Sequence, residues 1–289
     1  MRDNGLEYEL TTPAGLMDFT RSASAVTRLK QISFGAQVRG SKSSRSQQHG
    51  ARFETSFKDG GVLSVMLDVN PLRAANNAAI EAARTEIVTH ANELLDDDGV
   101  LGWTNRGGST ALALTGLRTL TDPVFQVDGH AWRVLLLLES PRPFAEDASA
   151  TIVDSAALSV GGGGFTIPLT IPFTFTASSG GDLEVTHAGD FKLAYPVLRA
   201  YGPITNPHVV NQTTGKRLVF EGSIAAGDYW EIDLFERSVL LNGVTKVRAL
   251  DASRSTWWAC VRGANDLQLA GSGYTSSTFL RAYMKSAWG

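Results

Sequence analysis

Apolar and polar residues alternate with a period of two along most of the chain, which predicts β-strands. Clear examples are LEYEL at 6–10, TALALTGLRTLTD at 110–122 and HAWRVLLLLES at 130–140, with Asp128-Gly129 as a turn before the last of them. The run RFETSFKDGGVLSVMLDV at 52–69 alternates on both sides of Asp59-Gly60-Gly61. A hairpin is therefore predicted at those glycines.

The period changes to helical spacing between Leu72 and Leu95. Five apolar residues there follow one another at steps of three and four, which marks one face of an amphipathic helix: Ile80, Ala83, Ile87, Ala91 and Leu94. This is the one long helix that the sequence predicts. The acidic run Asp96-Asp97-Asp98 is expected to end it.

Residues 141–164 are rich in Pro, Ala, Ser and Gly, which is typical of a segment that joins two domains. We therefore predict an N-terminal domain at 1–150 and a C-terminal domain at 160–289. Residues 165–175 alternate strictly and predict a half-buried strand that opens the second domain.

Short strands and turns continue to the end of the chain. The turns are expected at Thr213-Thr214-Gly215, at Ala226-Gly227-Asp228 and at Asn242-Gly243. Turns at this spacing favour an antiparallel sandwich. The predicted fold class is mainly β, with a sandwich-like first domain that carries the long helix and a second antiparallel β-sandwich.

Composition limits the possible functions. The net charge is −3 over 289 residues, which gives no general attraction to nucleic acid or to an anionic membrane. No apolar run reaches the length of a membrane helix and the first residues lack a signal sequence, so we expect a soluble protein made in a cytoplasm. The single cysteine, Cys260, is expected to fill the core.

No cofactor or metal site is predicted, because the five histidines form no ligand motif and no second cysteine exists. Glu231 and Asp233, two residues apart in YWEIDLF, have a spacing that a glycosidase could use. Alternation instead places Trp230, Ile232 and Leu234 inside and the two acids in water. We therefore expect no catalytic residues.

Aromatic side chains offer a different chemistry, since a ring face can stack on a sugar. The candidates for sugar stacking are Tyr229 and Trp258. Trp257 and Trp258 are adjacent, so one of the two is expected inside and the other outside. Asn211-Gln212-Thr213 matches a glycosylation acceptor but is interpreted as a turn.

The polar, basic segment Ser41–Gly50 is the most distinctive loop of the N-terminal half. It carries little apolar area to offset the entropy of ordering it, so its own domain is not expected to hold it. We predict that it contacts a neighbouring subunit. The residues expected to make this contact are Ser41, Lys42, Ser43, Ser44, Arg45, Gln47 and His49.

One stretch of the C-terminal half resembles a known family. YPVLRAYGPITNPHVVNQTTGKRLVFEGSIAAGDYWEIDLFERSVLLNG, followed by STWWACVRGANDLQLAG and RAYMKSAW, resembles the C-terminal domain of siphovirus distal tail proteins, known as Dit. The residues that carry the resemblance are Gly202, Asn206-Pro207, Thr214-Gly215, Gly227-Asp228, Ile232-Asp233, Asn242-Gly243, Trp257 or Trp258, Gly263 and Asn265. Residues 122–147 are similar to the end of the family's ring-forming domain.

The resemblance implies a galectin-like sandwich at the C-terminus and an N-terminal ring-forming, or belt, domain. It implies a non-enzymatic protein of the virion tail tip that forms a homohexameric ring between the tail tube protein and the tail-tip hub and tape measure proteins. DNA would pass through such a ring without specific binding. The alternative is a carbohydrate- or receptor-binding module of the tail tip, and a glycoside hydrolase is the third interpretation.

Overall fold

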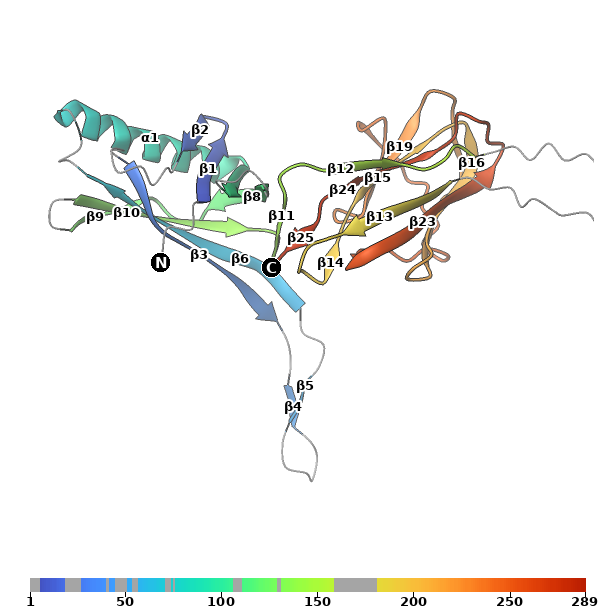
Figure 1. Cartoon of the computed structure of the whole chain (residues 1–289), viewed down its shortest axis with the longest axis horizontal. Coiled ribbons are helices and arrows are strands. Elements are labelled where there is room, and N and C mark those ends of the chain that lie inside the picture. The colour runs from blue at the N-terminus through green and yellow to red at the C-terminus, as the bar shows by residue number, and fades with distance from the viewer. Residues whose placement is uncertain are drawn as a thin grey trace, which may run out of the picture. The chain divides into compact units, whose positions relative to one another are not determined.

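The computed structural model describes residues 6–18, 27–39, 42–44, 51–53, 57–70, 74, 76–105, 111–128, 131–158 and 181–289. The chain separates into two compact units, one formed by Met1–Ala148 and the other by Ser149–Trp288. The described residues are mainly strand, paired antiparallel, with one long helix, which confirms the predicted mainly β class (Figure 1). The sandwich-like first domain is not observed, because the described strands of that unit, one short hairpin apart, form one sheet covered by the helix.

The N-terminal unit is built on one antiparallel sheet with the strand order β2-β1-β7-β8-β10-β6-β3. Two further strands of this unit attach to it, since β9 pairs with β10 and β11 pairs with β8. The strands are β1 (Leu6–Thr12), β2 (Gly15–Asp18), β3 (Thr27–Arg39), β6 (Phe57–Val69), β7 (Gly99–Asn105), β8 (Ala111–Thr119), β9 (Val124–Asp128), β10 (Ala131–Ser140) and β11 (Ala145–Asp147). A separate hairpin joins β4 (Lys42–Ser44) to β5 (Ala51–Phe53).

Helix α1 (Asn77–Asp96) covers one face of this sheet (Figure 1). It begins five residues later than the first residue of the predicted segment, because Asn76 caps it and the Asn76 side chain accepts the backbone N–H of Ala79 at 3.0 Å. Its buried residues follow the predicted face, with His90 added: Ala83, Ile87, His90, Ala91 and Leu94. The imidazole Nδ1 of His90 lies 2.7 Å from the hydroxyl of Thr12 on β1.

The hairpin predicted at Asp59-Gly60-Gly61 is wrong, because β6 runs straight through these residues. Gly61 pairs with Ala36 of β3 on one side and with Ser140 of β10 on the other. A Cβ on Gly60 would collide with the Ser140 carbonyl oxygen. The glycine at position 60 therefore serves a close approach of two strands and not a turn.

The C-terminal unit consists of two antiparallel sheets. One has the order β12-β24-β15-β19-β20-β21 and the other β13-β23-β16-β17, with β18 on β16. The strands are β12 (Thr151–Asp154), β13 (Asp182–His187), β15 (Val197–Tyr201), β16 (Ile204–Asn211), β17 (Lys216–Val219), β18 (Ser223–Ile224), β19 (Tyr229–Asp233), β20 (Ser238–Leu241), β21 (Thr245–Lys246), β23 (Gly263–Ser272) and β24 (Leu280–Met284). A separate short pair joins β14 (Leu193–Ala194) to β22 (Cys260–Val261). The last strand in the chain is β25 (Ala287–Trp288).

Alternate residues of both sheets form the core of this unit. Trp230, Ile232 and Leu234 are buried as predicted, and Val209 and Leu269 of the other sheet are buried too. Cys260 is also buried, and desolvation raises the pKa of its thiol to about 12, so it fills the core as expected. The unit is thus a β-sandwich.

The predicted turns are present in this unit. Asn242 and Gly243 have φ angles of 51° and 72°, and the N–H of Val244 bonds to the carbonyl of Leu241 at 3.0 Å. Two central residues with positive φ make the tight hairpin turn that an Asn-Gly pair predicts.

The segment expected to link the domains contains ordered strands. β11 lies in the first unit, and β12 pairs with β24 in the second, from Thr151↔Met284 to Asp154↔Arg281. The second unit therefore starts near Ser149 and not at residue 160. The predicted strand at 165–175 lies outside the described residues.

Candidate interaction surfaces

Besides the short terminal strand β2, two strands of the N-terminal sheet, β3 and β9, have an edge that no other described strand pairs. β3, with 13 residues, ends the order of the sheet, and its recorded partner is β6. β9 pairs with β10 through Val124↔Leu135 to Asp128↔Ala131 and with no further described strand. A long strand edge offers unpaired N–H and C=O groups to another chain.

Exposed apolar side chains accompany these two edges. Phe34 on β3 is 38% exposed, Val124 on β9 is 44% exposed, and Val62 on the intervening β6 is 36% exposed. On β6 the buried and less buried positions alternate, so Val62 and Met66 share the face that the helix does not cover. Exposed apolar side chains beside unpaired strand edges are typical of a protein contact.

Charged groups lie at one end of the same face. The carboxylate of Asp68 on β6 is 3.7 Å from the Nζ of Lys30 on β3 and 3.6 Å from the Nε of Arg133 on β10. Arg28 is the β3 residue opposite Asp68 in the strand register. Two neighbouring cations thus share one partly buried carboxylate at this end of the sheet.

The predicted contact loop lies largely outside the described residues. Of its seven residues, Lys42, Ser43 and Ser44 form β4, and their backbone pairs with β5. Ser41, Arg45, Gln47 and His49 fall outside the described ranges. The contact with a neighbouring subunit therefore stays a prediction.

The second surface is the outer face of the sheet β12-β24-β15-β19-β20-β21. Arg199 on β15 donates from Nε to Oε2 of Glu231 on β19 at 2.8 Å and from Nη1 to the hydroxyl of Tyr283 at 2.7 Å. Its guanidinium also lies 4.8 Å from the centre of the Tyr229 ring and 4.6 Å from that of Tyr283. Glu231 is therefore an ion-pair partner between rings and not a fully solvated acid.

Asp233 stabilises a turn. Its Oδ1 accepts the backbone N–H groups of Phe235 and Glu236, each at 2.8 Å, and so holds the turn after β19. Because one carboxylate is paired with Arg199 and the other with the backbone, the two acids do not form the open pair that a glycosidase requires.

The sugar-stacking prediction is wrong for Trp258. Trp258 is 3% exposed, so neither face of its ring is open. Tyr229 remains half-buried at the surface, but its ring contacts the Arg199 guanidinium and the Tyr201 ring, whose centre is 5.2 Å away. Alternation along a strand does not predict which of the two adjacent tryptophans is buried.

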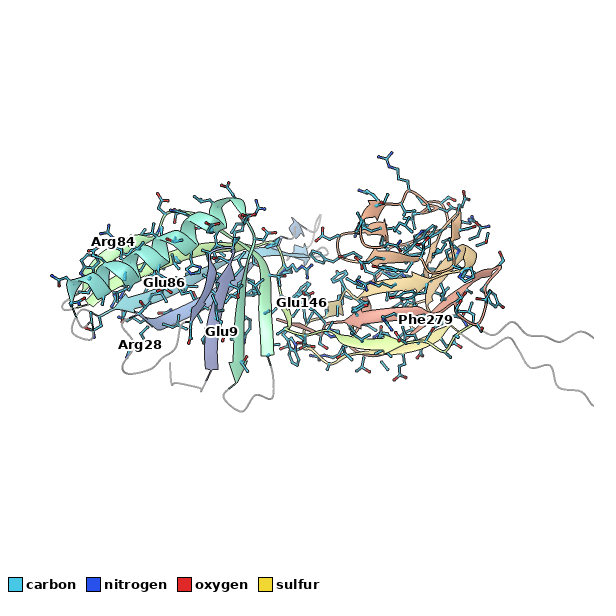
Figure 2. All side chains as sticks on the ribbon, turned by 90° about the horizontal axis from the view of Figure 1, so that it is seen from above. Glu9, Arg28, Arg84, Glu86, Glu146 and Phe279 are labelled. Atoms are coloured by element: carbon cyan, nitrogen blue, oxygen red, sulfur yellow. The ribbon has the colours of Figure 1, made fainter. Side chains whose placement is uncertain are left out.

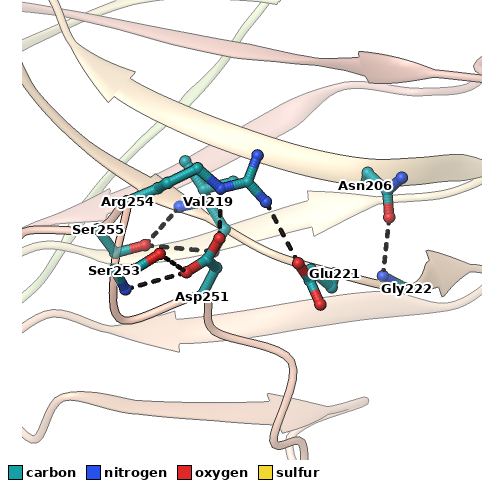
Figure 3. Close-up of polar contacts among 8 residues, drawn as sticks. All are labelled: Asn206, Val219, Glu221, Gly222, Asp251, Ser253, Arg254 and Ser255. Atoms are coloured by element: carbon teal, nitrogen blue, oxygen red, sulfur yellow. Dashed lines mark hydrogen bonds and ion pairs between the residues drawn. The ribbon is translucent and has the colours of Figure 1, made fainter.

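A polar cluster beside β17 is also structural (Figure 3). Oδ1 of Asp251 accepts the N–H of Ser253 at 2.9 Å and its hydroxyl at 2.6 Å, and Arg254 pairs with Asp251 and with Glu221. The hydrogen bonds from Ser253 and then Arg254 lower the pKa of Asp251 to about 2. The Ser255 hydroxyl accepts the Val219 N–H at 2.8 Å, which fixes this segment to β17.

The remaining candidates fit structural roles. Asn211 is fully buried and its Oδ1 accepts the N–H of Thr214 at 3.0 Å, which agrees with a turn. Within the described ranges, no three His, Cys, Asp or Glu side chains gather closely enough to hold a metal ion. The helix that the structure describes is not long and apolar enough to cross a membrane.

Comparison with known proteins defines the class of this fold. Residues 188–283 match the family model for the siphovirus-type tail component, C-terminal domain. The Dit protein (gp 19.1) of phage SPP1, described as a paradigm of the hub adsorption apparatus in phages that infect Gram-positive bacteria, has the same fold with a TM-score of 0.63 and 11% identity. The similarity covers 97% of this chain and 98% of that one.

A second structure has the same fold. The baseplate of phage P2 in its activated conformation matches with a TM-score of 0.52 and 14% identity, over 97% of this chain and 98% of the P2 chain. The curated protein sequences contain no significant match. The family match over residues 188–283 agrees with the predicted resemblance to the C-terminal domain of siphovirus distal tail proteins, and the whole chain shares the fold of the SPP1 Dit protein.

Proposed function

We propose that this protein is a distal tail protein of a long-tailed bacteriophage, working as a non-enzymatic ring at the tail tip. In this proposal six copies of the N-terminal unit close around the DNA channel, between the tail tube and the tail-tip hub with its tape measure protein. DNA passes through the ring without specific binding. The C-terminal sandwich is carried as a scaffold.

The observation that carries the proposal is the pair of free edges in one sheet. β3 and β9 lie on opposite sides of the β10-β6 pair, so the edge of β3 in one copy can pair with the edge of β9 in the next. Such a contact joins two different surfaces, and contacts of this type generate rings when the rotation closes. The exposed Phe34 and Val124 would be buried in the same step.

The hairpin β4-β5 supports the same arrangement. It lies between β3 and β6 in the chain, and among the described strands β4 and β5 pair only with each other. A hairpin that does not extend the main sheet of its own unit can contact a neighbouring copy. The sequence of residues 41–50 is polar and basic, so this segment can supply donors and adaptable hydrogen bonds to such a surface.

The test is the size and shape of the purified full-length protein. We expect mass photometry to give a hexamer and negative-stain electron microscopy to show rings with a central opening. A protein that stays monomeric at the highest attainable concentration, and in the presence of its tail tube protein, would contradict the ring.

A further inference from the structure

Three aromatic rings form a row across the outer face of the C-terminal sheet. Tyr229 on β19 lies beside Tyr201 on β15, and Tyr201 stacks on Phe279 with ring centres 4.4 Å apart and planes 8° apart. Phe279 immediately precedes β24, and it is labelled in Figure 2. It is the last ring of the row on the β12 side.

The outer face of Phe279 has a small neighbour. β12 and β24 pair in a constant register, and the chain continues this pairing past β12, where the N–H of Ser155 bonds to the Leu280 carbonyl at 2.8 Å. Continuing the register places Ala156 beside Phe279. Ala156 is exposed and carries a single methyl group, so among the described residues it leaves room over the ring.

An arginine and aspartate pair lies one position further along the same strands. Arg281 donates from Nε to Oδ1 of Asp154 at 2.6 Å and from Nη2 to Oδ2 at 2.8 Å. The guanidinium is 5.7 Å from the centre of the Phe279 ring and 5.6 Å from that of Tyr201. Because it is almost equally far from two parallel rings, it lies beside their edges and does not cover the outer face of Phe279.

We propose that the outer face of Phe279 and the Arg281–Asp154 pair together form a binding site for a neutral saccharide. A pyranose has one face of C–H groups, which can lie on an aromatic ring, and a rim of hydroxyl groups that both donate and accept hydrogen bonds. The guanidinium supplies donors and the carboxylate supplies acceptors, and their mutual hydrogen bonds hold them in position. Because the two charges cancel, the site favours an uncharged ligand.

Other ligands fit these observations less well. A nucleic acid could stack a base on Phe279, but its phosphates need unpaired cations, and the two arginines of this face are paired with Glu231 and Asp154. A protein partner could use the same Tyr- and Arg-rich face. Docking by a protein would not require a ring face left free at the end of the row, and the test below separates the two.

The test uses the full-length protein with a panel of methyl glycosides of hexoses, 6-deoxyhexoses and N-acetylhexosamines. We expect saturation-transfer NMR to detect at least one of them and titration to give its affinity. Phe279→Ala should weaken that affinity roughly tenfold or more, since the stacking contact is lost. Asp154→Asn should weaken it without removing the ring, which keeps the test valid if Phe279→Ala fails to fold.

Phe279→Tyr keeps a stacking face and should retain binding, and Phe235→Ala removes an aromatic ring outside the row and should leave the affinity unchanged. The multimer should keep its size in all these variants, which separates this site from ring formation. If no glycoside of the panel binds, or if Phe279→Ala and Asp154→Asn bind as the wild type does, the inference is wrong. If these two variants instead lose binding to a tail protein while no sugar binds, the face is a protein contact and the saccharide site is likewise refuted.

Discussion

Arg199 on β15 and Glu231 on β19 occupy opposite positions of two antiparallel strands, and the guanidinium Nε lies 2.8 Å from the carboxylate Oε2. The rings of Tyr229 and Tyr283 contact the same guanidinium, so the pair is partly shielded from water. Such a pair is screened less than an exposed one, and removal of one partner leaves the other charge partly desolvated. It organises the outer face of the C-terminal sheet.

Glu231→Gln should therefore lower the free energy of unfolding by about 1–2 kcal/mol, because Arg199 loses its charged acceptor. Urea denaturation of the full-length protein measures this change. The matched control is Glu236→Gln, whose side chain is exposed and which should change stability by less than about 0.5 kcal/mol. Equal effects of the two substitutions would show that the pair contributes nothing.

Val124→Asp should dissociate the ring, because it places a charge on the free edge of β9 where the neighbouring copy is proposed to pair. Mass photometry should show the multimer replaced by monomer. Val244 on a turn of the other unit is 82% exposed, and Val244→Asp, the same chemical change, should leave the multimer intact. A Val124→Asp protein that still forms rings would exclude β9 from the contact.

Gly60→Ala should destabilise the N-terminal unit by about 2 kcal/mol or more, because the new Cβ meets the backbone carbonyl of Ser140, which cannot rotate away. Gly35→Ala on the adjacent β3 is the control, since a Cβ there meets no atom within 4 Å. Thermal unfolding compares the two. A tolerated alanine at position 60 would mean that β6 and β10 separate easily at this point.

Stability should fall as the pH drops below about 6.5, the ordinary pKa of histidine. Burial lowers the pKa of His90, although Glu86 and Glu93 oppose the effect, and burial likewise lowers the pKa of His208 in the other unit. Since the unfolded chain then binds more protons than the folded one, unfolding becomes easier with acid until the lowered pKa is passed.

Urea denaturation at pH 7.5, 6 and 5 tests this linkage. His90→Gln should flatten the pH dependence of the N-terminal unit, and His208→Gln should flatten that of the C-terminal unit. A wild-type protein whose stability is constant between pH 7.5 and 5 would contradict both assignments.

Local chemistry was enough to predict much of the fold from the sequence. Ala83, Ile87 and Leu94 on the helix and Trp230 and Ile232 on β19 are buried as predicted. The spacing of residues that share one face depends only on the backbone geometry of a single helix or strand. The Asn242-Gly243 turn formed because few residues other than Asn and Gly accept positive φ. These features need no information from distant parts of the chain.

Contacts between distant segments determined the features that the sequence did not predict. Gly60 is followed by another glycine and suggested a turn, but β3 and β10 pair on either side and keep β6 straight. Glu231 alternates with buried residues and so was expected in water, yet Arg199, 32 residues away, holds it. Trp258 and Phe279 are both aromatic, and packing alone buries the first and leaves the second at the end of a ring row. The sequence by itself therefore determined elements and turns, whereas the tertiary structure determined which faces are covered, because coverage depends on contacts between residues far apart in the chain.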